Sequence, residues 1–210
     1  MSEFELSMRF TDEQIVEQPA QQSARRYALE LGLPTISRTL GAHLAFVAAS
    51  TRAERIIEIG STGGLTTTWL HRGAPKATIT CIDNEPEHLA QTRRALLEAA
   101  HPATAIRCIS GDPHRVLPRM SEDTYDLVLI TGPLQHVSAH LQHGLRVVRP
   151  GGTILVLNAL NQGRVADPAR RDAITTSLRL VIREFQRQPD LVTSVIPIDG
   201  GLLQVTALPQ

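Results

Sequence analysis

Glu58 stands two residues before a glycine, at the end of an apolar run, in the stretch ERIIEIGSTGGLTTTWL (residues 54–70). Gly60 and Gly64 allow the backbone to turn tightly and approach a ligand, and the amides at the start of the next helix, near Thr66, would point toward it. A dinucleotide site uses a Gly-x-Gly-x-x-Gly turn instead, and it needs no acid before the turn. The segment therefore favours a ligand with one cationic and one anionic group over a pyrophosphate.

Two further junctions carry polar residues where a strand is expected to end. Asp83 lies 23 residues beyond Gly60, where a carboxylate can accept hydrogen bonds from both ribose hydroxyls. Gly111 and Asp112 follow the next apolar run and can meet an adenine edge. S-adenosylmethionine combines an ammonium, a carboxylate, a ribose and an adenine without phosphate, so it fits all three junctions. The predicted cofactor-binding residues are Glu58, Gly60, Ser61, Thr62, Gly64, Thr66, Asp83, Asn84, Gly111, Asp112 and Thr131.

Short runs rich in Ile, Val, Leu and Thr must position these residues. They predict strands over residues 55–60, 77–83, 105–110, 125–131 and 152–158. Each run is followed by a helical pattern, and strands that are apolar on both faces and alternate with helices indicate a parallel sheet covered on both sides. The sequence therefore predicts an α/β fold whose ligand lies at the carboxyl ends of the strands.

The amino-terminal region predicts a layer of helices over residues 11–50. Helical patterns cover about 12–18, 22–31 and 37–49, with Ser37 as a candidate N-cap, and residues 1–10 are expected to be flexible.

The carboxyl-terminal region has a different pattern. A long helix is expected over about 168–187, and two strand candidates separated by Asp-Gly-Gly then predict a terminal hairpin. No linker divides the chain, so residues 1–210 are expected to form a single domain whose α/β core covers 55–210.

The composition limits the partners. The 210 residues hold 21 Lys plus Arg and 21 Asp plus Glu, which gives no broad charge for nucleic acid or an anionic membrane. The longest apolar stretches run about ten residues, and about 20 are needed to cross a bilayer. Cys81 and Cys108 lie inside strand-like runs, as reduced core thiols do. We expect a cytoplasmic protein with a small-molecule partner.

From about residue 35 onward the sequence resembles class I S-adenosylmethionine-dependent O-methyltransferases. The similar branch is the small bacterial one, with actinobacterial members, that is related to catechol and caffeoyl-CoA O-methyltransferases. The motifs are IIEIGSTGGLTTTWL, TCIDNEPEHLAQTRRAL, SGDPHRVLPRM, YDLVLIT, LRVVRPGGTILVLN and GRVADP. The resemblance implies a Rossmann-like, seven-stranded sheet of order 3-2-1-4-5-7-6 with the last-numbered strand antiparallel. It also implies a homodimer.

The resemblance holds in the cofactor half and fails in the catalytic half. Where the family has its first metal-binding aspartate this chain has Thr131, and where the family has its general-base lysine it has Leu134. The family's Asp-Asn pair after the fifth strand is Leu157 and Asn158 here. One neutral amide cannot hold Mg²⁺, which needs several oxygens including a carboxylate. We therefore expect no divalent metal.

Three histidines follow the fourth predicted strand. His136, His140 and His143 are spaced to share one helix face, where they would hold a metal, relay protons or simply face solvent. His136 is nearest the strand end, and an imidazole can accept a proton near neutral pH. His136 and Asn158 are the catalytic candidates.

The leading hypothesis is methyl transfer from S-adenosylmethionine to a hydroxyl of a small molecule without a metal. The alternative is a degenerate, non-catalytic methyltransferase that keeps the cofactor or S-adenosylhomocysteine as a regulatory or structural ligand. Methylation of nucleic acid is disfavoured by the neutral charge and by the absence of an Asp/Asn-Pro-Pro-aromatic motif, and a nicotinamide dehydrogenase is a more distant possibility.

Overall fold

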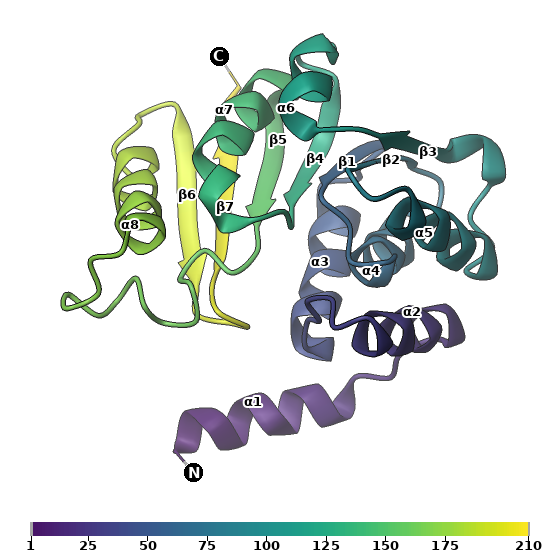
Figure 1. The fold of residues 1–210 in the computed structure, drawn as a ribbon, viewed down its shortest axis with the longest axis horizontal. Coiled ribbons are helices and arrows are strands. Elements are labelled where there is room, and N and C mark those ends of the chain that lie inside the picture. Colours follow the sequence, from purple (N-terminus) through teal and green to yellow (C-terminus); the bar gives the residue numbers. More distant parts are fainter. Residues whose placement is uncertain (1, 210) are drawn as a thin grey trace.

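The computed structural model describes residues 2–209, and its centre is one sheet of order β3-β2-β1-β4-β5-β7-β6 (Figure 1). The strands are β1 (Arg55–Ile59), β2 (Thr78–Asp83), β3 (Ile106–Ser110), β4 (Tyr125–Ile130), β5 (Val148–Val156), β6 (Leu191–Ile196) and β7 (Leu202–Ala207). β7 runs antiparallel to β5 and β6, whereas β1 to β5 pair in parallel. The predicted fold class, strand order and antiparallel last strand are confirmed.

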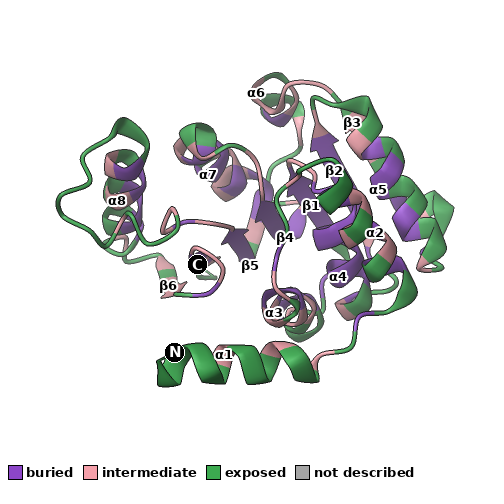
Figure 2. Ribbon diagram, turned by 60° about the horizontal axis from the view of Figure 1, so that its bottom comes forward, coloured by how far each residue is buried: buried purple, intermediate pink, exposed green. Residues whose placement is uncertain are grey.

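Both faces of the central strands are buried. Along β1, Ile56 packs into the core on one side of the sheet, and Ile57 and Ile59 pack into the core on the other side. Every residue of β4 is buried, and Figure 2 shows the central strands largely in the purple of buried residues. Because side chains alternate between the faces of a strand, an unbroken apolar run is what a sheet covered on both sides requires.

Helices cover the two faces. One core contains side chains of α2 (Pro19–Glu30), α3 (Arg38–Ser50), α4 (Leu65–Gly73) and α5 (Pro86–Glu98). The other contains side chains of α7 (Val137–Val147) and α8 (Ala173–Phe185). The remaining short elements are η1 (Ala103–Ala105), α6 (Pro113–Val116), η2 (Leu117–Arg119) and η3 (Leu134–His136). No helix in the described part of the chain is long and apolar enough to span a membrane.

The amino terminus differs from the prediction. α1 spans Glu3–Gln14, so residues expected to be flexible are helical and the predicted helix over 12–18 is wrong. The reason is local: Ser2 and Glu5 form a reciprocal capping box that starts the helix early. α1 buries none of its residues and extends along one side of the molecule (Figures 1 and 2).

Other predicted boundaries are close to those observed. Ser37 caps α3, as predicted, by accepting a hydrogen bond from the amide of Leu40 at 3.0 Å. α8 is shorter than the predicted helix because Asp172 caps its start, accepting from the amide of Thr175 at 3.0 Å. β5 begins at Val148, four residues earlier than predicted, because it includes the Pro-Gly-Gly turn.

Candidate active site

A cavity of about 540 Å³, here called the strand-end cavity, opens at the carboxyl ends of the central strands. Its walls come from loops after β1, β2, β3, β4 and β5, from the segment before α3 and from the β6–β7 turn. It includes nine predicted site residues: Gly60, Ser61, Thr62, Asp83, Asn84, Asp112, Thr131, His136 and Asn158. Its volume suits a small-molecule ligand.

The turn after β1 depends on two glycines. Gly60 has φ +90°, and a Cβ there would lie 2.7 Å from the backbone nitrogen of Gly132. Gly64 has φ +92° as the residue before α4, and a Cβ there would lie 2.8 Å from the Cβ of Ala95. Left-handed backbone and the lack of space both demand glycine here. The turn thereby brings the start of α4 close to the cavity wall.

Glu58 lies behind this wall and does not line it. Its side chain is completely buried, and its two carboxylate oxygens accept hydrogen bonds from the hydroxyls of Thr66 and Thr67. Burial raises the pKa of Glu58 to about 7, against the opposing effect of these two hydrogen bonds. Glu58 and Thr66 are therefore hydrogen-bonded to each other. The sequence had predicted that Glu58 contacts the ammonium group of the cofactor and Thr66 its carboxylate.

The turns after β2 and β3 present their carboxylates to the cavity. Asp83 accepts a hydrogen bond from the amide of Glu85 at 2.8 Å through Oδ1. Asp112 caps α6 by accepting from the amide of His114 at 2.9 Å. Gly111, also predicted, supports the turn from outside the cavity lining, and its amide donates to the carbonyl of Asp83 at 2.9 Å. The two carboxylates are therefore held in place by backbone hydrogen bonds.

Three imidazoles from two segments meet at the cavity wall. The ring of His114 lies 4.7 Å from that of His136 and 5.1 Å from that of His140, measured between ring centroids, and His136 and His140 are 5.9 Å apart. We call this set the histidine cluster. The sequence placed His143 beside His136 and His140, and the ring that completes the cluster is instead His114, from α6.

His140 is only 2% exposed, and within residues 2–209 neither of its ring nitrogens has a hydrogen-bond partner. Burial lowers the pKa of His140 to about 4, and repulsion from the neighbouring imidazoles adds to this effect. His140 is therefore neutral at neutral pH. The solvent-facing interpretation of these histidines is wrong for His140, because α7 turns it inward against Gly132.

The far end of the cavity holds the positions where the sequence departs from the family pattern. Thr131, Leu134, Leu157 and Asn158 all line it. The Asn158 oxygen accepts the backbone and side-chain N–H groups of Gln162, each at 3.2 Å. In residues 2–209 no three His, Cys, Asp or Glu side chains are arranged to hold one metal ion. These four positions contribute no carboxylate, the ligand that Mg²⁺ favours.

Asp199 lines the cavity and was not among the residues predicted from the sequence. It belongs to the Asp-Gly-Gly turn between β6 and β7, and its carboxylate accepts a hydrogen bond from the amide of Ser37, at the start of α3. The turn is also hydrogen-bonded to the loop after β5. The amide of Ala159 donates to the carbonyl of Gly201 at 2.9 Å, and the amide of Leu160 donates to the carbonyl of Gly200 at 2.8 Å. The Asp-Gly-Gly sequence predicted a hairpin turn here, but it did not predict that the turn lines the cavity.

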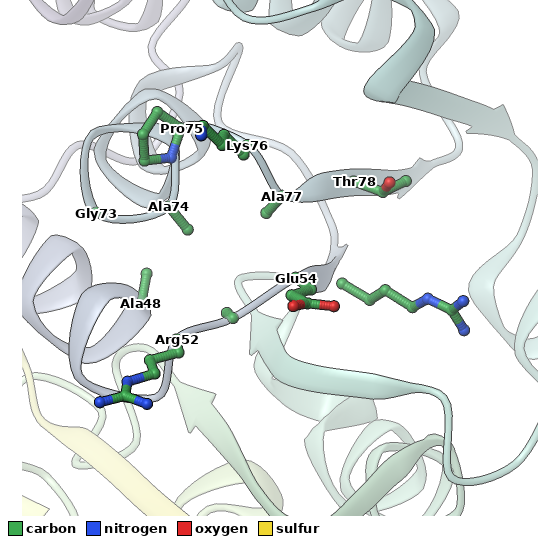
Figure 3. A pocket seen from close by; sticks show the side chains of 11 residues that line it. Ala48, Arg52, Glu54, Gly73, Ala74, Pro75, Lys76, Ala77 and Thr78 are labelled. Carbon is green, nitrogen blue, oxygen red and sulfur yellow. The ribbon is translucent and has the colours of Figure 1, made fainter.

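A second hollow of about 560 Å³ lies at the other end of β1 and β2 (Figure 3). Its charged lining residues are Arg52, Glu54, Arg55 and Lys76. None of the predicted site residues belongs to it, and parallel sheets bind ligands at the opposite edge. The strand-end cavity is therefore the candidate active site.

Comparison with known proteins identifies the family of the chain. The sequence profile of the O-methyltransferase family matches residues 5–208. A protein of Mycobacterium sp. (strain JLS), itself assigned only provisionally as an O-methyltransferase, is 32% identical over 203 residues, which cover 96% of this chain and 92% of the relative.

Solved structures share the fold along the whole chain. A Corynebacterium glutamicum protein has a TM-score of 0.93 at 26% identity, covering 100% of this chain and 99% of that one. The O-methyltransferase TomG from Streptomyces achromogenes, solved in complex with S-adenosylmethionine, has a TM-score of 0.86 at 24% identity and covers 100% of both chains. The fold, the family profile and the curated relative agree, and the chain belongs to the O-methyltransferase family.

Proposed function

We propose that this protein transfers a methyl group from S-adenosylmethionine to a hydroxyl of a small molecule without help from a divalent metal. The observation that carries the proposal is that the three cofactor-directed turns and the residues after β4 and β5 line one cavity. S-adenosylmethionine supplies a methyl group already activated on a sulfonium. The protein then has mainly to align the acceptor oxygen and exclude water.

The first half of the cavity supports the cofactor assignment. Asp83 uses Oδ1 for the amide of Glu85, and within residues 2–209 no hydrogen bond involves Oδ2, which leaves that oxygen for ribose hydroxyls. Glu58 fixes Thr66 and Thr67 in the first turn of α4, so it supports the loop from Gly60 to Gly64 from behind. The amides of Leu65 and Thr66 are used within this loop, because they donate to the carbonyl and the hydroxyl of Thr62.

The histidine cluster offers a candidate general base for the methyl transfer. We assign His136 as the residue that accepts the hydroxyl proton while the oxygen bonds to the methyl carbon and the carbon–sulfur bond breaks. His136 is exposed at the cavity wall, and its ring contacts two further imidazoles. His140 remains neutral beside it, so the neighbouring ring adds no positive charge that would oppose proton uptake.

The test combines binding with turnover. Calorimetry should show binding of S-adenosylmethionine and S-adenosylhomocysteine, and labelled methyl transfer to a panel of hydroxyl compounds should proceed with a chelator present. His136→Asn should slow transfer by about 100-fold or more, the effect of removing a general base. His143→Asn, in α7 and outside the cavity lining, is the control for loss of an imidazole and should keep the wild-type rate.

A second candidate is a binding protein without turnover. Leu134 and Leu157 favour it, because apolar side chains occupy the family's base and ligand positions in the cavity. Tight binding of both cofactor forms, with no transfer to any compound of the panel, would support this second candidate against the enzyme.

We further propose that the protein forms a homodimer. α1 presents Phe4, Leu6 and Phe10 at 58%, 51% and 64% exposure, and Phe46 of α3 is 67% exposed. Large exposed apolar side chains are frequent at protein interfaces, and these four are the basis of the proposal.

A further inference from the structure

The strand-end cavity has an uneven charge, and this bears on the acceptor. Within residues 2–209 its lining includes the carboxylates Asp83, Glu85, Asp112 and Asp199 and no lysine or arginine. Recognition of a carboxylate or phosphate group relies on such cations, above all on the guanidinium of arginine. The charge of the cavity therefore disfavours binding of an anionic acceptor.

The four carboxylates do not share one position. Asp83, Glu85 and Asp112 come from the turns after β2 and β3, in the half that we assign to the cofactor. Asp199 comes from the β6–β7 turn, which lies against Asn158 and Gln162 of the loop after β5. The Asp199 carboxylate therefore supplies the negative charge at the end of the cavity that is left for the acceptor.

In the part of the chain that the structure describes, Asp199 has no cationic partner. None of the ion pairs formed within residues 2–209 includes it, and its recorded hydrogen bond comes from the backbone amide of Ser37. Leu33, Ile36 and Leu157 line the same cavity and give it apolar walls. A half-buried carboxylate beside apolar walls gains most from a ligand that brings its own positive charge.

We propose that the acceptor is an apolar hydroxyl compound that carries a basic amine, and that Asp199 binds its ammonium group. The inference rests on the proposed function, because it assigns this end of the cavity to the acceptor. It names a substrate class: hydroxylated amines are preferred, neutral alcohols and phenols are weaker, and acids are rejected. Asp199 is in this view a specificity-determining residue.

The test uses three phenols of similar size that differ in charge. Tyramine is cationic at pH 7, 4-ethylphenol is neutral and 3-(4-hydroxyphenyl)propionate is anionic. Calorimetry on protein saturated with S-adenosylhomocysteine should rank them in that order, with tyramine binding about tenfold more tightly than 4-ethylphenol. In Asp199→Asn the amide oxygen can still accept from Ser37, and the tenfold preference should disappear while 4-ethylphenol binds as before. Asp190→Asn removes the same charge from an exposed position before β6 and should change nothing.

Each other outcome overturns the inference. Equal affinities, a preference for the acid, or failure of tyramine to bind would reject the amine class. If Asp199→Asn weakened tyramine and 4-ethylphenol alike, Asp199 would only support the cavity wall, and if it weakened S-adenosylhomocysteine, Asp199 would serve the cofactor. Failure of the wild type to bind S-adenosylhomocysteine at all is a separate result, which rejects the proposed function itself.

Discussion

Thr66 donates a hydrogen bond from its hydroxyl to the carboxylate of Glu58, and both side chains are completely buried. Burial raises the pKa of Glu58 from 4.5 to about 7 in the folded protein. A folded-state pKa above the unfolded one means that the folded protein binds more protons between these values. The free energy of unfolding should therefore fall as pH rises from about 4.5 through 7.

Glu58→Gln should remove this dependence. The variant should lose the slope between pH 5 and pH 8, and at pH 8 it should be more stable than the wild type by up to about 3 kcal/mol, the equivalent of the shift. Urea unfolding at several pH values measures this. The exposed Glu54→Gln is the control and should keep the wild-type slope; a slope that persists in Glu58→Gln would assign it to another group.

Asp83→Asn should weaken both S-adenosylmethionine and S-adenosylhomocysteine by about tenfold to 100-fold. The amide keeps an oxygen for the Glu85 amide, so the turn is preserved, but the charged hydrogen bonds to ribose hydroxyls are lost. Calorimetry gives the affinities, and Asp123→Asn on the surface supplies the charge control. Unchanged affinity would remove Asp83 from the cofactor site.

Comparing Gly60→Ala with Gly163→Ala separates the cost of left-handed backbone from the cost of steric contact by the added Cβ. Both glycines have positive φ, +90° and +84°, but a Cβ at Gly163 would meet nothing within 4 Å. Gly163→Ala should cost about 1 kcal/mol of stability, the cost of left-handed backbone for a residue with a Cβ. Gly60→Ala should cost distinctly more and should also reduce cofactor affinity, because the turn must shift away from Gly132. Equal losses of stability in the two variants would contradict this account.

The dimer predicts a mass of twice 23.0 kDa by light scattering at micromolar concentration. Phe4→Ser combined with Phe10→Ser should give a monomer while leaving the far-ultraviolet circular dichroism almost unchanged, because both side chains are exposed and α1 buries nothing. A wild-type mass near 23.0 kDa would refute the dimer.

Cofactor binding and methyl transfer should be insensitive to chelators and to added Mg²⁺ or Mn²⁺. Thr131→Asp combined with Leu157→Asp would restore carboxylates beside Asn158, and this double variant should bind Mg²⁺ in calorimetry where the wild type does not. Thr131→Asn with Leu157→Asn is the matched neutral control. Chelator inhibition of the wild type that metal reverses would show that other ligands have rebuilt a metal site.

The sheet could be predicted from the sequence because each strand is marked by the residue types of its own short segment. Unbroken apolar runs such as residues 125–130 form a strand buried on both faces, and each run ends at a glycine or polar residue that marks the junction. Asp83, Asp112 and Thr131 could be assigned to one edge for the same reason, since parallel strands place their carboxyl ends together.

The histidine cluster and Asp199 could not be predicted in this way. His114 and His136 follow different strands, and their contact depends on how α6 and η3 leave the sheet. Asp199 reaches the cavity because β7 pairs with β5 and brings the turn beside the loop after β5. Spacing within a helix pointed to His143 instead, because helical periodicity carries no information about neighbours from another segment.

The loop after β5 rests on the β6–β7 turn through two backbone hydrogen bonds, and Asp199 of that turn accepts from the start of α3. Three segments far apart in the sequence therefore behave as one structural module at the acceptor end, while the cofactor turns belong to another part of the chain. For protein engineering, a loop transplanted alone from a relative would arrive without its support. Residues 33–40, 157–162 and 198–201 have to be exchanged as a set if a new acceptor preference is to be installed on the same cofactor platform.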